Sequence, residues 1–284
     1  MDDWLPLVES RVCGAWPLPG DATCAGLARR TFRRVAGALG LDPEVTDDGV
    51  TMVSELAANT LHAQAEQGQQ PGRGPRAPAP ELWLYLRGAG PRRELVCKVF
   101  DSFRGWVHGT APAHGPRPVA PDATSGRGLE VVHELSRGRW GYHPTRARLA
   151  GPGVGEVGVG GLGVGGKAVW FSVPAATAPV RPEWMPASAA MTEFEEGLTA
   201  RGLEATMVRA DDSAADIAVL AVHAGLTAWC WCGTAWLHAP GLVSHQWGYC
   251  DLVEVTERAV EAYESLTAKS EPAPLGPLVH ALRE

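Results

Sequence analysis

Three polar side chains share one stripe of a predicted helix at residues 50–63, V-T-M-V-S-E-L-A-A-N-T-L-H-A. The segment has no Gly or Pro and is rich in Ala and Leu, which favours a helix. Glu55, Asn59 and His62 lie at i, i+4 and i+7, so they fall on the same side of it. Such a stripe is most often the solvated face of an amphipathic helix. A carboxylate and a carboxamide one turn apart can instead point into a site, where their oxygens suit Mg²⁺ and the carboxylate can take a proton from a nucleophile.

Two later segments carry groups that could complete such a site. Asp101 ends the strand-like run E-L-V-C-K-V-F-D at residues 94–101. Further along, the turn S-G-R-G-L at residues 125–129 leads directly into a predicted helix that extends to about residue 136. Backbone N–H groups at such a turn, with the positive end of a helix behind them, can bind an anion such as phosphate. The glycine turn alone is a weak signal, because many helices begin after glycine.

Two other patterns lack the context that their usual functions need. The run G-V-G-G-L-G at residues 158–163 matches the dinucleotide-binding fingerprint, but a strand follows it where the fingerprint requires a helix. We therefore expect residues 151–166 to form a glycine-rich hairpin connection. Cys230 and Cys232, with histidines nearby, suggest zinc, yet C-x-C in a strand directs its two side chains to opposite faces. The sequence favours a buried strand there over a metal site.

The composition is that of a globular protein of 284 residues with a formal net charge of −7. Residues 187–284 hold 14 acidic and 5 basic side chains, which argues against nucleic acid as a partner. The N-terminus has neither the basic start nor the long apolar run of a signal peptide. No segment reaches the roughly 18 apolar residues that a membrane span needs. We therefore expect a cytoplasmic protein without membrane association, whose six cysteines are reduced.

The hydrophobic pattern predicts a first domain over residues 1–176. Its strands alternate apolar residues, as in a sheet that helices cover on one side. A polar turn at residues 42–49 offers Asp47 or Asp48 to cap the helix that follows. The other expected elements are a helix at 22–41, a hairpin of strands at 81–87 and 94–101, an irregular loop at 109–122, and strands from residue 139 and at 167–173.

A second domain is expected over residues 187–284, after a Pro-rich linker at 175–186. Its pattern mixes helices and strands and therefore predicts a small α/β module. The expected elements are a helix at 187–201, strands at 203–208, 216–223 and 226–238 (the last as one strand or two), and a final helix from about 250 to 269.

The order of these pieces resembles the ATP-binding domain of the GHKL superfamily, and more narrowly the bacterial anti-sigma-factor serine kinases and their actinobacterial relatives. The similarity spans roughly residues 16–173. It rests on S-E-L-A-A-N-T-L-H-A, which matches the family's N-box, then on Asp101, the glycine turn and the closing strand G-K-A-V-W at 166–170. The resemblance implies an α/β fold of the α+β kind, a two-layer sandwich in which a mixed sheet is covered by helices on one face. Residues 187–284 resemble no family that we recognise.

The resemblance also implies a role for each candidate residue. Asn59 would ligate the Mg²⁺ that bridges the phosphates of ATP, and Glu55 would be the general base that activates a water or a protein hydroxyl. Asp101 would accept the adenine amino hydrogen. His62 would pack rather than react. The phosphates would be wrapped by Ser125, Gly126, Arg127, Gly128 and Leu129, with residues 105–124 as a lid.

One residue departs from the family pattern. The family's Asp box often reads D-x-G, whereas this chain has Asp101-Ser102-Phe103. Phe103 replaces the glycine that lets the backbone approach the adenine, so we expect a reduced affinity for ATP.

Three functions use these same residues. The first is an ATP-binding regulator of transcription that phosphorylates a serine or threonine of an anti-anti-sigma-type partner and sequesters a sigma factor. The second is a non-catalytic ATP-binding switch whose C-terminal module binds an unrelated partner. The third is an ATP hydrolase, which differs only in the acceptor. Both Glu55 and Asn59 favour a catalyst, whereas the altered Asp box and the extra module favour the switch. The resemblance also implies a homodimer.

Overall fold

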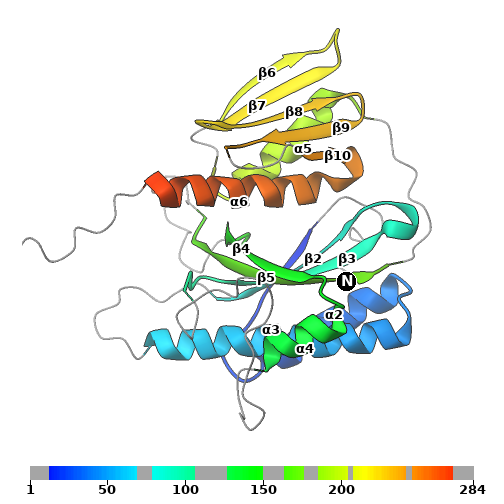
Figure 1. The fold of residues 1–284 in the computed structure, drawn as a ribbon, viewed down its shortest axis with the longest axis vertical. Coiled ribbons are helices and arrows are strands. Elements are labelled where there is room, and N and C mark those ends of the chain that lie inside the picture. The colour runs from blue at the N-terminus through cyan, green and yellow to red at the C-terminus, as the bar shows by residue number, and fades with distance from the viewer. Residues whose placement is uncertain are drawn as a thin grey trace, which may run out of the picture.

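Helices and sheets alternate in four layers (Figure 1). The computed structural model describes residues 13–68, 79–105, 127–149, 163–175, 185–203, 207–240 and 245–270. Helices α2 (Cys24–Ala38), α3 (Pro43–Gly68) and α4 (Gly128–Leu135) form the first layer, and a five-stranded sheet, sheet A, forms the second. Helices α5 (Ala187–Thr199) and α6 (Leu252–Ser270) form the third layer, and a second five-stranded sheet, sheet B, forms the fourth. The α+β class expected from the sequence is confirmed.

Sheet A has the strand order β1-β2-β3-β5-β4, and all of these neighbours pair antiparallel. The expectation of a mixed sheet is therefore wrong. The predicted hairpin is confirmed, because β2 and β3 pair from Glu81↔Phe100 to Arg87↔Glu94. The strands are β1 (Gly14–Pro17), β2 (Glu81–Arg87), β3 (Glu94–Asp101), β4 (Trp140–Arg146) and β5 (Gly165–Pro174), with a short 3₁₀ turn at Gly90–Arg92 in the hairpin.

Helix α3 begins seven residues earlier than expected, because Asp42 and Pro43 supply its start signal. The Asp42 carboxylate accepts a hydrogen bond from the Glu44 N–H at 2.8 Å. Pro43 occupies the first helical position, where its missing N–H costs nothing. Asp47 and Asp48 lie inside the helix, so the prediction that one of them caps it is wrong. Helix α3 therefore has a full extra turn and more with which to pack against α2.

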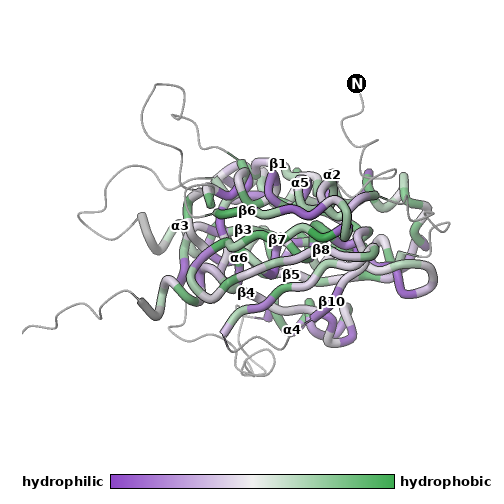
Figure 2. Tube along the Cα trace, turned by 90° about the horizontal axis from the view of Figure 1, so that it is seen from above, coloured by the Kyte–Doolittle hydropathy of each residue, from purple (hydrophilic) through white to green (hydrophobic). Residues whose placement is uncertain are grey.

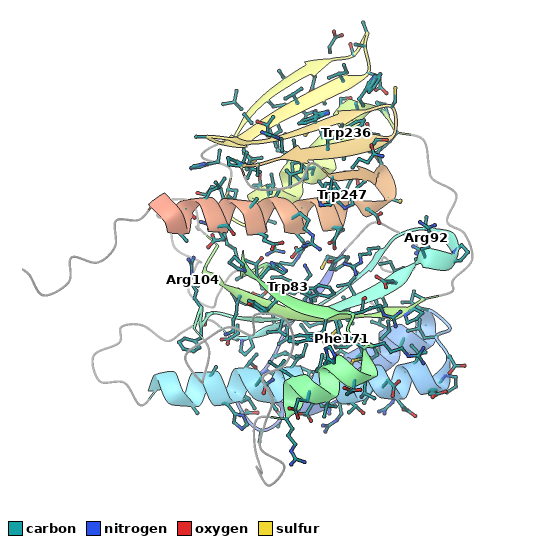
Figure 3. All side chains as sticks on the ribbon, viewed as in Figure 1. Trp83, Arg92, Arg104, Phe171, Trp236 and Trp247 are labelled. Carbon is teal, nitrogen blue, oxygen red and sulfur yellow. The ribbon has the colours of Figure 1, made fainter. Side chains whose placement is uncertain are left out.

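Both faces of sheet A are covered, whereas the sequence pattern predicts helices on one face only. On the side of α2, α3 and α4, Leu95, Cys97 and Val99 join the larger core. On the other side, Trp83 and Tyr85 are fully buried, beneath α6. Figure 3 shows Trp83 on the α6 side of the sheet and Phe171 on the α3 side. The two-layer sandwich is thus extended by the C-terminal module, because the second face of the sheet is itself apolar and aromatic at alternate positions.

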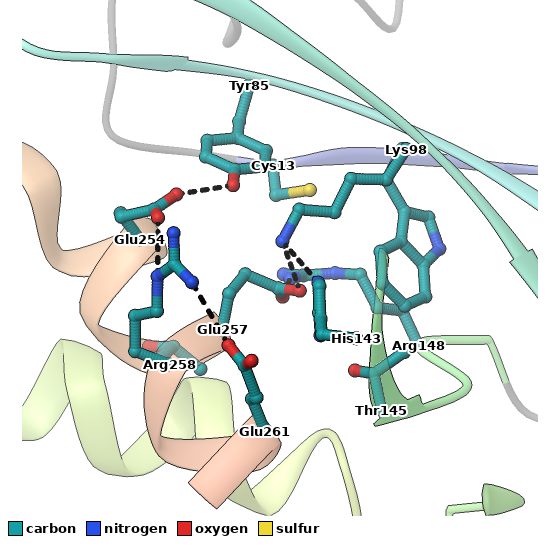
Figure 4. Close-up of polar contacts among 12 residues, drawn as sticks. Cys13, Tyr85, Lys98, His143, Thr145, Arg148, Glu254, Glu257, Arg258 and Glu261 are labelled. Carbon is teal, nitrogen blue, oxygen red and sulfur yellow. Dashed lines mark hydrogen bonds and ion pairs between the residues drawn. The ribbon is translucent and has the colours of Figure 1, made fainter. Parts of the chain in front are cut away.

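Charged side chains occupy the centre of the contact between sheet A and α6 (Figure 4). Lys98 Nζ donates hydrogen bonds to Glu257 Oε2 at 3.1 Å and to His143 Nε2 at 3.0 Å. Arg148 donates to Glu257 at 3.1 Å, and Arg201 also pairs with this carboxylate. Burial would raise the pKa of Glu257, but Arg201, Lys98 and Arg148 together hold it well below its usual range. Glu257 is therefore a buried, ionised carboxylate with three cationic partners.

Sheet B has the order β10-β9-β8-β7-β6, again with all neighbours antiparallel. One face packs on α5 and α6, while Trp229 and Trp231 stack beside Trp236 on the other face. Figure 2, seen from the side of sheet B, gives the hydropathy along these strands. The strands are β6 (Val208–Asp212), β7 (Ile217–His223), β8 (Leu226–Trp231), β9 (Thr234–His238) and β10 (His245–Gly248), followed by a 3₁₀ turn at Tyr249–Asp251.

Two strand predictions in this module need correction. The strand expected at residues 203–208 is not continuous, since Leu203 and Met207 lie outside any strand and β6 begins at Val208, while residues 204–206 lie outside the described residues. The segment 226–238 forms two strands, because Cys232 (φ 46°) and Gly233 (φ 77°) make a left-handed turn between them. Strand β10 was not expected from the sequence.

The two expected domains each contain a hydrophobic core, one with members from Leu18 to Ala175 and one from Ala187 to Ala262. A third, smaller cluster on the α6 face of sheet A includes Trp83 and Phe100 and is contacted by Val253 of α6. The boundaries 1–176 and 187–284 stay a prediction. Among the described residues, no helix is both long and apolar enough to cross a membrane.

His143 is held neutral in the contact with α6. Its Nε2 accepts the bond from Lys98, and its Nδ1–H donates to the carbonyl oxygen of Pro144 at 3.1 Å. Burial, together with the charge of Lys98, lowers the pKa of His143 from 6.5 to about 3. The unfolded chain therefore takes up this proton at a higher pH than the folded protein does. The stability that the neutral imidazole contributes is complete above about pH 6.5 and is lost as the pH falls toward 3.

We expect His143→Gln to flatten the pH dependence of stability, because glutamine offers Lys98 an acceptor but does not titrate. Between pH 7.5 and pH 5, the wild-type chain should lose about 2 kcal/mol more unfolding free energy than the variant. Urea unfolding at the two pH values measures this difference. His238→Gln, at an exposed position, is the matched control and should keep the wild-type pH dependence. Equal slopes for His143→Gln and the wild-type chain would show that His143 is not buried in its neutral form.

Candidate functional site

The polar stripe of α3 lies only partly in solvent. Glu55 and Asn59 are half-buried, while Met52 and Leu56 on another side of the helix are buried in the core. The sequence therefore placed the helix faces correctly. His62 is exposed, so the expectation that it packs is wrong.

Gly128, the first residue of α4, lies directly against this stripe. A Cβ atom at position 128 would stand 2.8 Å from Glu55 Oε2 and 3.5 Å from both amide atoms of the Asn59 side chain. A methyl group at this position would press on the carboxylate, so the glycine leaves Glu55 in its present position. The structure brings together three residues that are up to 73 positions apart in the sequence. The positive end of α4 lies next to a carboxylate and a carboxamide.

The other residues of the glycine turn are only partly described. Arg127 is exposed and precedes α4 with helical dihedral angles (φ −79°, ψ −8°). Leu129 packs against the hydrophobic core, so only its backbone could contact a phosphate. Ser125, Gly126 and nearly all of the expected lid at 105–124 lie outside the described residues.

Asp101 is at the end of β3, where the hairpin prediction put it. It alternates with Cys97 and Val99, whose side chains contact the core, and therefore belongs to the α3 side of sheet A. It is 3% exposed, and its Oδ1 accepts the N–H of Phe103 at 2.9 Å. Its Oδ2 accepts a hydrogen bond from Lys167 Nζ at 2.8 Å. Among the described residues, these two bonds use two of about four acceptor positions of this carboxylate, which leaves two for a ligand.

Lys167 also belongs to the site, although the sequence pattern assigns it no role. It pairs with Asp101 in the register of β3 and β5, so both side chains lie on the same face. Its Nζ also donates to the carbonyl oxygen of Phe103 at 2.5 Å and lies 5.1 Å from the centre of the Phe103 ring. In the sequence, Lys167 simply follows a glycine in the closing strand, and this pattern does not indicate Asp101 as its partner. Only the strand register shows it.

Phe103 follows a bend at Ser102, directly after the end of β3. Its N–H caps the Asp101 carboxylate in the manner of an Asx turn. The hydroxyl oxygen of Ser102 is buried and has no hydrogen-bond partner among the described residues. A ligand with a donor or acceptor at this position would satisfy it.

These residues fit an anionic ligand that carries a magnesium ion. Mg²⁺ is usually held by one or two protein oxygens together with the phosphates of its substrate, so Asn59 can suffice as the protein ligand and Glu55 stays available as a base. The absence of a side chain at Gly128 leaves space next to them, and the α4 N-terminus favours negative charge there. A carboxylate with spare acceptor positions, such as Asp101, suits an amino group.

The cysteine pair has no common environment. Cys230 is buried in β8, and burial raises the pKa of its thiol to about 12. Cys232 is exposed in the turn that follows. The described residues contain no group of three His, Cys, Asp or Glu side chains that could hold a metal. The glycine run 158–163 lies almost entirely outside the described residues.

Neither a scan against models of known protein families nor a search of curated proteins finds a match for this chain. The GHKL resemblance therefore rests on the residues quoted above.

The Asp101–Lys167 pair can be tested by its effect on stability. Both side chains are largely buried, with 4% and 11% exposed. We expect Lys167→Met to cost about 3 kcal/mol of unfolding free energy, because it leaves the Asp101 carboxylate without its cation. The double variant Asp101→Asn/Lys167→Met should recover much of this loss. Urea unfolding of the wild-type chain, both single variants and the double variant gives the coupling. Additive losses would show that the pair is not formed.

Proposed function

We propose that this protein binds Mg·ATP at the site formed by Glu55, Asn59, Gly128 and Asp101 and transfers the γ-phosphate to a serine or threonine of a protein partner. The observation that carries the proposal is the approach of Gly128 to Glu55 and Asn59. A helix N-terminus with no side chain at its first residue, placed over a carboxylate and a carboxamide, suits a magnesium-bound phosphate chain.

Phosphate transfer of this kind requires little covalent chemistry from the protein itself. Glu55 accepts the proton of the partner's hydroxyl, whose oxygen bonds to the γ-phosphorus as the bond to the β,γ-bridging oxygen breaks. ADP leaves with the electron pair of that bond, and the partner carries the phosphate. Mg²⁺, held through Asn59, would neutralise charge on the phosphates. Asp101 would select adenine by accepting a hydrogen of its amino group.

A second candidate is an ATP-binding switch with no transfer activity. The ion pair between Asp101 and Lys167 favours it, because a nucleotide must share this carboxylate with a buried cation. The Phe103 side chain beside Lys167 favours it as well, since it fills space next to the proposed adenine position. In that case nucleotide binding would change the affinity of the chain for a partner. An ATP hydrolase would use the same residues with water as the acceptor.

The partner is expected to be a protein. An anti-anti-sigma-type protein carrying the acceptor hydroxyl, or a sigma factor held without phosphate transfer, fits the resemblance. Because the proposed activity uses ATP, we propose that it takes place in the cytoplasm. We also propose that the ATP-binding domain forms a homodimer.

Nucleotide binding should depend on two residues of the site. Asn59→Asp adds a second negative charge one turn from Glu55, and Asp101→Asn replaces an acceptor oxygen with a donor. Each should raise the Kd for a non-hydrolysable ATP analogue with Mg²⁺ by roughly tenfold to a hundredfold in calorimetric titration. Asp47→Asn, on an exposed turn of the same helix, is the control for a lost carboxylate. If Asn59→Asp and Asp101→Asn bind like the wild-type chain, the nucleotide site is not here.

Phosphate transfer should depend on Glu55. With radiolabelled ATP and proteins that co-purify with the chain, Glu55→Ala should lower transfer about 10²–10⁴-fold while the Kd for the nucleotide changes little. Glu44→Ala, in the exposed first turn of α3, is the control and should transfer normally. Free phosphate measured in the same reactions separates transfer from hydrolysis. Transfer by Glu55→Ala at the wild-type rate would exclude Glu55 as the base, and nucleotide binding without any transfer by the wild-type chain would favour the switch.

A further inference from the structure

One contact of the C-terminal helix reaches the loop that carries Asp101. Glu264, near the end of α6, has a side chain that is 1% exposed. Its Oε2 accepts from Arg104 Nη2 at 2.5 Å and its Oε1 accepts from Arg146 Nε at 2.5 Å. Arg104 is three residues after Asp101, and Arg146 ends β4. Glu264 therefore joins α6 to the segment 101–105, hereafter the Asp101 loop.

Arg104 reaches α6 past the start of β5. A side chain at Gly165 would collide with the Arg104 guanidinium, so the glycine leaves a passage at this end of the sheet. Figure 3 labels Arg104 between the sheet and the C-terminal end of α6. Residue 165 pairs with Arg146 in the register of β4 and β5, so the two arginines meet Glu264 at the same corner of sheet A.

The Asp101 loop is held by contacts on both sides of sheet A. On the α3 side, Lys167 bonds to the Asp101 carboxylate and to the carbonyl oxygen of Phe103. On the α6 side, Glu264 holds Arg104, the next residue. Since the peptide between Phe103 and Arg104 is shared, a shift of Arg104 moves the Phe103 carbonyl and with it the lysine that pairs with Asp101.

Glu254 and Glu257 of α6 contact different parts of the sheet. Glu254 accepts from Tyr85 at 2.6 Å and from Arg87 at 3.5 Å, and Glu257 meets the cluster around Lys98. None of the contacts described for Glu254 or Glu257 involves the Asp101 loop. Glu264 therefore differs from Glu254 and Glu257 in contacting the Asp101 loop, whereas all three carboxylates are buried.

We propose that Glu264 is a positioning residue for the Asp101 loop, through which the C-terminal module sets the affinity of the proposed site for nucleotide. This inference rests on the proposed function. Because binding free energies are reciprocal, nucleotide at Asp101 stabilises the docked position of α6 by the same amount. A partner that displaces α6 from sheet A would then lower nucleotide affinity.

The experiment is a calorimetric titration of the full chain with a non-hydrolysable ATP analogue and Mg²⁺. Glu264→Gln should raise the Kd roughly tenfold. Arg104→Gln should do the same, and the double variant should add little to either single change. Arg104 has a side chain that is 53% exposed, so its substitution keeps the test informative if Glu264→Gln fails to fold. Glu254→Gln is the matched control, since it removes another buried carboxylate (6% exposed) from the same helix face and should leave the Kd unchanged.

Each outcome is decisive. A wild-type chain that binds no nucleotide overturns the proposed function and the coupling with it. A wild-type chain that binds, with the same Kd in Glu264→Gln and Arg104→Gln, overturns the coupling alone. Equal weakening by Glu254→Gln and Glu264→Gln also overturns it, because the effect would then come from general loosening of α6. Thermal unfolding of each variant, measured alongside, shows how much α6 has been loosened.

Discussion

The structure depends on the docking of an acidic face of α6 onto a basic and aromatic face of sheet A. Glu254, Glu257, Glu261 and Glu264 recur every three or four residues and so form one stripe of the helix. Three of them meet cations from strands or loops of the first domain. A buried pair of this kind adds little net stability compared with apolar packing, but removing one partner costs about 3–5 kcal/mol. Its main physical effect is to fix one register of α6 on the sheet.

Because successive side chains of each strand point to opposite faces, sheet A contacts two different environments. Asp101 of β3 and Lys167 of β5 belong to the α3 side. Lys98 and Phe100, also of β3, belong to the α6 side. The strand ends are where the two sides meet, because a side chain can pass around an end but not through the sheet. Arg104 does so at Gly165. A site at the end of β3 can thus be affected by changes on either face of the sheet.

Local signals predicted most of the first domain. The hairpin with Asp101 at its end followed from strict alternation and a Gly- and Pro-rich turn, and the helix stripe of Glu55 and Asn59 followed from the 3.6-residue period. The start of α3 differs from the prediction, because Asp42-Pro43 is a cap with proline at the first helical position and not part of a turn. That Gly128 packs on Glu55 depends on tertiary packing, which spacing in the sequence does not contain. The α6 stripe, read alone, is typical of a solvated helix face, since its cationic partners in the first domain are more than 100 residues away.

The central claim is that nucleotide binding at the α3 side of sheet A is linked to α6 on the other side. Hydrogen–deuterium exchange of the full chain, with and without a non-hydrolysable ATP analogue and Mg²⁺, tests it most directly. We predict slower exchange in α3 around Glu55 and Asn59, at the start of α4, and also in the C-terminal turns of α6 around Glu264. Protection confined to α3 and α4 would contradict the link to α6, and no change in any of these segments would contradict the nucleotide site itself.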